Sequence, residues 1–130
     1  MAYQREKIEQ FEQALQTLED ILTHEKNDIV RDATIQRFEY TVEAFWKALK
    51  TVLRESLGID AASPKAVLRS AGGADICKEE EVSLALTMID DRNETSHLYT
   101  RALAEKLFEK IPRYTKLLRL LCDRMKSTSV

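Results

Sequence analysis

Residues that interrupt or crosslink a chain are scarce in this sequence, which has three Gly, two Pro and two Cys in 130 residues. So few Gly and Pro residues argue against turn-rich β-sandwiches, collagen-like repeats and disordered chains. Cys77 and Cys122 are far apart and have no neighbouring histidine. We therefore expect two small buried hydrophobic side chains, with no disulfide and no zinc site.

Long apolar runs are also missing. No stretch approaches the ~20 apolar residues of a membrane-spanning helix. The residues after Met1, "AYQREKIEQFEQ", lack the apolar core of a signal peptide. We therefore expect a cytoplasmic protein with no membrane association.

The residues that are abundant favour helices, because 44% of the chain is hydrophobic and 32% is charged. Apolar residues recur every three or four positions, as on one face of an amphipathic helix. Capping residues and glycines divide this pattern into segments. The sequence thus predicts an all-α protein, an antiparallel up-and-down four-helix bundle with a short extra helix, in one domain over residues 1–130. The predicted helices cover about 3–25, 29–56, 64–72, 78–92 and 98–125.

Charge is distributed unevenly along the chain. Residues 98–130 contain eight Lys or Arg and three Asp or Glu, a net charge of +5, which leaves −7 on residues 1–97. Such asymmetry fits a surface that faces phosphate or an acidic partner, and it also fits an ordinary solvated helix face.

Sequence motifs of metal and cofactor enzymes are absent. There is no Gly-rich phosphate loop, no HExxH and no Gly-x-Ser-x-Gly turn, and the single ExxH, Glu94 to His97, has no second copy of the kind that a di-iron bundle requires. We therefore expect neither a metal site nor a cofactor.

The segment "RNETSHLY" stands out because Arg92 and His97 lie where the apolar periodicity breaks. On one continuous helix, five residues would place these two side chains roughly 140° apart. Asn93, Thr95 and Ser96 disfavour helix interiors and favour caps, so we expect one helix to end near Asn93 and the next to begin near His97. Arginine binds phosphate and histidine exchanges protons near neutral pH, a combination suited to phosphodiester chemistry.

This segment resembles the Arg-x4-6-His signature of HEPN (higher eukaryotes and prokaryotes nucleotide-binding) domains, in the form Arg-x4-His-x-Tyr. The stretches "RDATIQRFEYTVEAFWKALK", "SPKAVLRSA" and "IPRYTKLLRLL" are similar to one branch, the nucleotidyltransferase substrate-binding proteins. The resemblance extends over nearly the whole chain.

The resemblance implies two functions of different classes. In the first, the chain is a metal-independent ribonuclease toxin paired with a minimal nucleotidyltransferase antitoxin. His97 then acts as general acid and base, Arg92 stabilises the phosphorane and Asn93 orients the site. In the second, the chain is a non-catalytic subunit that presents an RNA or nucleotide substrate to the nucleotidyltransferase. A structural alternative remains, in which Arg92 only pairs with Asp90 or Glu94 and His97 caps a helix.

Three further expectations accompany this interpretation. A homodimer that joins the two "DDRNETSHLY" segments would supply two histidines and two arginines to one site. The resemblance implies that the partner nucleotidyltransferase transfers AMP to Tyr99 and so switches the nuclease off. The alternative is that Tyr99 is an ordinary interface aromatic with its hydroxyl in water. Arg37 and Lys47 either belong to a solvated helix face or bind RNA phosphates beside the site.

Overall fold

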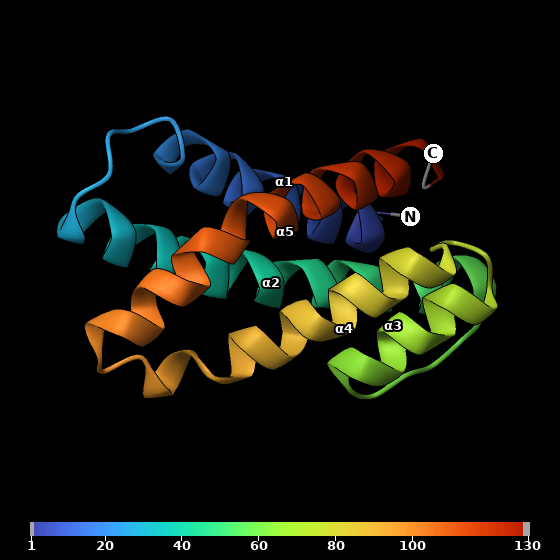
Figure 1. Cartoon of the computed structure of the whole chain (residues 1–130). Helices are drawn as coiled ribbons and strands as arrows, with labels where there is room; N and C mark the ends of the chain where they lie inside the picture. The colour runs from blue at the N-terminus through green and yellow to red at the C-terminus, as the bar shows by residue number, and fades with distance from the viewer. Residues whose placement is uncertain (1, 129–130) are drawn as a thin grey trace.

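The computed structural model describes residues 2–128, which form an all-α protein (Figure 1). Four long α-helices, a short α3 and one turn of 3-10 helix, η1, follow one another along the chain. The predicted fold class is confirmed. The elements are α1 (Ala2–Ile21), α2 (Asp28–Leu57), α3 (Pro64–Gly73), α4 (Glu79–Asn93), η1 (Thr95–His97) and α5 (Arg101–Thr128).

Local capping explains where α2 begins and ends. Asn27 adopts an extended backbone, and its side-chain oxygen accepts a hydrogen bond of 2.8 Å from the backbone amide of Val30. Gly58 ends the helix in the left-handed conformation, with φ of +67°, and its amide donates to the Arg54 carbonyl at 3.1 Å. Ser63 caps α3 in the same way as Asn27 caps α2.

Helix α2 is the centre of the bundle and contacts each of the other four α-helices. It runs antiparallel to α1, while α4 and α5 cross it on their way between the two ends of the bundle (Figure 1). Phe45 of α2 packs on Phe11 of α1 with ring centroids 5.5 Å apart. Phe38 of α2 stacks on Tyr114 of α5 at 5.8 Å. These four rings are almost fully buried, so α2 holds the core together.

The core also contains threonines whose hydroxyls find partners within the helices. Thr41 donates to the Arg37 carbonyl at 2.6 Å, and Thr34 donates to the Val30 carbonyl at 2.7 Å. This back-bonding satisfies the hydroxyls and allows threonine to be buried. Both cysteines are free and buried, as expected. Phe45 is buried and Trp46 only partly so.

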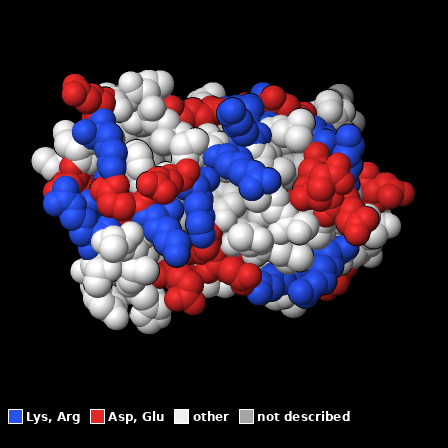
Figure 2. Space-filling view, in the orientation of Figure 1, with Lys and Arg blue, Asp and Glu red and all other residues white. Residues whose placement is uncertain are grey.

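Ion pairs between helices account for much of the charge asymmetry. Arg119 of α5 pairs with Glu12 and Glu19 of α1 at 3.0 and 2.6 Å. Arg124 of α5 pairs with Glu81 of α4 at 2.6 Å. Basic residues of α5 are thus balanced by acids of other helices, and Figure 2 shows Lys and Arg interspersed with Asp and Glu over one face. No helix in residues 2–128 is long and apolar enough to cross a membrane.

Candidate active site

The α4–α5 junction contains the Arg92–His97 segment. Helix α4 ends at Asn93, in agreement with the sequence, and η1 follows as a single tight turn. The amide of His97 donates to the Glu94 carbonyl at 3.0 Å and closes this turn. The chain is therefore not one continuous helix between Arg92 and His97.

Helix α5 begins at Arg101, a few residues later than the sequence indicated. Thr100 is its cap, because the Thr100 hydroxyl accepts a hydrogen bond of 3.3 Å from the Leu103 amide. Residues 98–100 are non-helical, since η1 winds more tightly than an α-helix and does not continue into it. His97 does not cap α5, so the free amides at the start of this helix lie further along the chain than expected.

Arg92 is anchored to α2. Its Nε donates to the Glu39 carbonyl oxygen at 3.2 Å, and its Nη1 lies 3.4 Å from Thr95 Oγ1 and 3.9 Å from Glu39 Oε2. The Thr95 hydroxyl lies 3.1 Å from Glu39 Oε2 and 2.8 Å from the Arg92 carbonyl oxygen. The Arg92 side chain remains 31% exposed. A ligand could thus reach the guanidinium without displacing its backbone contact.

Glu39 and Thr95 are the residues of this site that the sequence did not reveal. Asp90 and Glu94, the local partners considered for Arg92, do not pair with it in the described part of the chain. Asp90 instead lies 2.6 Å from Lys65. Glu39 is 53 positions before Arg92, and no local pattern connects two residues so far apart.

The other predicted site residues of this segment are exposed. Asn93 is the last residue of α4, His97 is the last residue of η1, and Tyr99 is 84% exposed. Within residues 2–128 the His97 imidazole makes no hydrogen bond or ion pair. A phosphate or a macromolecule can therefore reach all three side chains.

A second polar contact holds the end of α4 against α5. The Tyr114 hydroxyl donates a hydrogen bond to Asp91, and Lys110 lies 3.5 Å from the same carboxylate. Burial raises the pKa of Tyr114 above its ordinary range, and the bond to Asp91 adds to this effect. The phenol therefore stays protonated and keeps donating to Asp91. This contact fixes the helix that carries Arg92.

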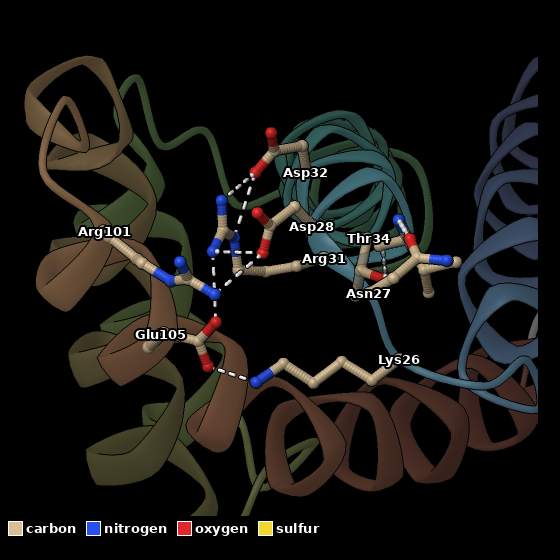
Figure 3. A network of polar contacts seen from close by, with 9 residues as sticks. Lys26, Asn27, Asp28, Arg31, Asp32, Thr34, Arg101 and Glu105 are labelled. Carbon is tan, nitrogen blue, oxygen red and sulfur yellow. Dashed lines mark hydrogen bonds and ion pairs between the residues drawn. The ribbon is translucent and has the colours of Figure 1, made fainter.

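A network around Arg31 fixes the start of α5 (Figure 3). Arg31 lies near the start of α2 with its side chain only 10% exposed, and it donates to Glu105 of α5 at 3.0 Å. Arg101 reaches back to Asp28 at 3.3 Å, and Lys26 contacts Glu105 (Figure 3). Hydrogen bonds from Lys26 and Arg31 hold the pKa of Glu105 below its ordinary value. The junction is thus attached to α2 on both sides of η1.

Arg37 and Lys47 lie apart from each other. The Arg37 guanidinium donates to the Thr17 carbonyl of α1 at 2.7 Å, so it joins α1 to α2. Two helical residues advance about 200°, which places Arg37 on nearly the opposite side of α2 from Glu39. Lys47 lies 3.4 Å from Glu43 and is half exposed. The structure therefore gives Arg37 a packing contact and leaves Lys47 on the surface.

The helical bundle has an arginine, Arg92, in the last turn of its fourth helix and an exposed histidine, His97, five residues later, as expected of a HEPN-related protein. The family model described as "Nucleotidyltransferase substrate binding protein like" matches residues 6–127, and the chain belongs to this family. Among solved structures, a crystal structure of a protein from Thermus thermophilus is similar. It is 46% identical, the match covers 88% of this chain and 98% of that one, and the TM-score is 0.85. No curated protein matches the chain.

Proposed function

We propose that this chain is the HEPN-type component of a toxin–antitoxin-like pair with a separate minimal nucleotidyltransferase, and that it is a metal-independent endoribonuclease. The observation that carries the proposal is the α4–α5 junction. Arg92 is held by α2, and His97 is exposed on the turn that follows. A cation held in place and an accessible acid–base group are two of the groups that phosphodiester cleavage requires.

The proposed reaction uses the ribose 2′-hydroxyl of RNA as the nucleophile. His97 accepts the hydroxyl proton while the 2′ oxygen bonds to the adjacent phosphorus. The bond from phosphorus to the 5′ oxygen then breaks, and a second histidine protonates the leaving oxygen. The products are a 2′,3′-cyclic phosphate and a 5′-hydroxyl. Arg92 stabilises the charge of the phosphorane, and Asn93 orients the substrate.

The second histidine would come from another copy of the chain. Tyr99 and Leu103 are exposed beside the junction, at 84% and 43%, and provide apolar surface for an isologous contact. We therefore propose a homodimer with the two junctions near its two-fold axis. Light scattering at micromolar concentration should give twice the monomer mass of 15.0 kDa. A monomer would exclude both the dimer and the composite site.

The nuclease is tested by RNA cleavage in EDTA. We expect His97→Ala and Arg92→Ala to lower cleavage by at least about 100-fold each, the usual range for an acid–base group or a charge-stabilising group. His24→Ala is the matched control, because His24 is the other exposed histidine and lies near the end of α1. Equal losses in His24→Ala and His97→Ala would contradict the assignment.

A non-catalytic subunit is the second candidate. The contacts of Arg92 with Glu39 favour it, because they occupy part of the guanidinium that would otherwise face a phosphate. In that case the chain binds RNA or a nucleotide for the nucleotidyltransferase and cleaves nothing. Stimulation of nucleotidyl transfer by a His97→Ala chain, with no RNA cleavage by the wild type, would support this function over the nuclease.

We also propose that the nucleotidyltransferase modifies Tyr99. The exposed phenol oxygen would attack the α-phosphorus of ATP, releasing pyrophosphate and the phenol proton. The attached AMP brings negative charge beside Arg92 and competes for its guanidinium. Incubation with the nucleotidyltransferase, ATP and Mg²⁺ should add the mass of one AMP and abolish cleavage. Tyr99→Phe should show neither effect, and an AMP-sized gain in that variant would exclude Tyr99.

A further inference from the structure

A second surface with the chemistry of a nucleic-acid site lies at the other end of α2. There the start of α1 and the last turns of α2 lie at the same end of the bundle (Figure 1) and form a cleft of about 320 Å³. We call it the α1–α2 cleft. Its lining includes four cations and two aromatic rings: Lys7, Lys47, Lys50, Arg54, Tyr3 and Trp46.

The cations of the α1–α2 cleft are only partly neutralised. Lys47 lies 3.4 Å from Glu43, and Arg54 lies 3.9 Å from Glu55. Lys7 and Lys50 have no carboxylate partner among the described residues. Among the described residues, no acidic side chain lines the cleft itself. The α1–α2 cleft therefore offers positive charge to an anionic ligand.

The aromatic side chains add a second kind of contact. Tyr3 is 47% exposed, with Lys7 Nζ at 5.3 Å and the Arg54 guanidinium carbon at 5.8 Å from its ring centroid. Trp46 is partly buried, and its indole N–H donates to Glu43 at 3.1 Å, which fixes the ring. Exposed rings bordered by cations are how proteins bind single-stranded nucleic acids, because bases stack on the rings while cations contact phosphates.

The α1–α2 cleft and the Arg92 junction lie along one face of α2. Positions 39, 43, 47, 50 and 54 recur every three or four residues, so their side chains share that face. The two acids among these positions have basic partners, because Glu39 pairs with Arg92 and Glu43 pairs with Lys47. From 39 to 50 the helix rises about 16 Å, on the order of five stacked nucleotides at ~3.4 Å each.

We propose that the α1–α2 cleft binds single-stranded RNA several nucleotides away from the bond that is cut. Lys7 and Lys50 contact backbone phosphates, and a base stacks on Tyr3. This rests on the proposed function, which supplies RNA as the ligand. An acidic protein segment would use the four cations equally well but would gain little from an exposed ring, so the aromatic lining favours RNA.

The test is fluorescence anisotropy with a labelled single-stranded oligouridine of about 12 nucleotides. All variants carry His97→Ala, so that cleavage does not interfere with binding. We expect the double variant Lys7→Gln, Lys50→Gln to show a shallower plot of the logarithm of the association constant against the logarithm of the salt concentration. The slope should decrease in magnitude by about 1.4, or about 0.7 for each lost phosphate contact. Lys116→Gln, at an exposed lysine on α5, is the control for loss of one charge and should leave the slope unchanged.

The aromatic contact is tested separately. Tyr3→Ala should weaken binding of the oligouridine about tenfold, because a stacked base is lost, while Tyr3→Phe retains the ring and should bind normally. An unchanged affinity in Tyr3→Ala, or equal competition by a polyglutamate peptide, would overturn the assignment to RNA.

The two proposals fail independently. If the cleft variants bind normally while His97→Ala abolishes cleavage of RNA by the otherwise wild-type chain, the α1–α2 cleft is excluded and the nuclease stands. If the wild-type chain does not cleave but the cleft variants lose affinity and salt dependence, the nuclease is excluded and the cleft stands.

Discussion

Glu81→Gln tests the connection between α4 and α5 most directly. The Glu81 side chain is only 9% exposed, and Arg124 donates to both of its oxygens, at 2.6 and 3.0 Å. The Lys78 amide also donates to Glu81 at 2.8 Å, which caps α4. Glutamine keeps one oxygen for the Lys78 amide, but its other terminal atom is an NH2 group, which cannot accept the second hydrogen bond from the Arg124 guanidinium.

The expected cost follows from these contacts. A hydrogen bond to a charged group contributes about 1.5–3 kcal/mol, and breaking a fully buried ion pair costs about 3–5 kcal/mol. Arg124 is 26% exposed and regains part of its hydration, so we expect a loss of about 2 kcal/mol. For a chain of 130 residues this corresponds to a melting temperature about 7 °C lower.

Urea unfolding followed by the fluorescence of Trp46, the single tryptophan, measures this loss. Glu80→Gln is the matched control, because Glu80 is the exposed neighbour in the same first turn of α4 and shares its interaction with the helix dipole. We expect the control to cost less than about 0.5 kcal/mol. Equal shifts of the two unfolding midpoints would refute the contribution of the Arg124 pair.

The same pair predicts a pH dependence. Hydrogen bonds from Arg124 hold the pKa of Glu81 below its ordinary value and outweigh the effect of burial. The ionised form is therefore favoured in the folded chain. Its contribution is complete above the unfolded pKa of about 4.3 and is lost as the pH falls through the folded pKa. The stability difference between wild type and Glu81→Gln should accordingly shrink between pH 6 and pH 3, and a constant difference would contradict this explanation.

Other predictions concern the glycines and cysteines. Gly58→Ala should cost about 1 kcal/mol, because φ is +67°, whereas Gly73→Ala should be neutral or stabilising, because no described residue outside its own stretch of helix lies within 4 Å of the added Cβ. Urea titrations of both variants check the difference, and equal effects would contradict it. Burial raises the pKa of Cys77 and Cys122 to about 11, so alkylation at pH 8 should be at least about tenfold slower in the native than in the denatured chain. Native alkylation at the denatured rate would show that these thiols are accessible.

Helix boundaries could be predicted from the sequence where they depend on neighbouring residues. Asn27, Ser63 and Gly58 each act on backbone groups within a few positions, so their caps are visible as local patterns. The break after Asn93 followed from poor helix formers in the same way. The predicted start of α5 was a few residues too early. Asn93, Thr95, Ser96 and Thr100 can all cap a helix, and the local sequence does not show that Thr100 is the one that caps α5.

Partners of charged residues were decided only by the tertiary structure. Arg92 pairs with Glu39, and Arg31 pairs with Glu105, 74 positions away. Such pairs depend on which helix faces lie together and in what register, whereas periodicity shows only that each helix has a buried face. The +5 charge of the last segment illustrates the difference. The sequence determined how much charge is present, and helix packing decided how much of it is neutralised by acids of other helices, such as Glu12, Glu19 and Glu81.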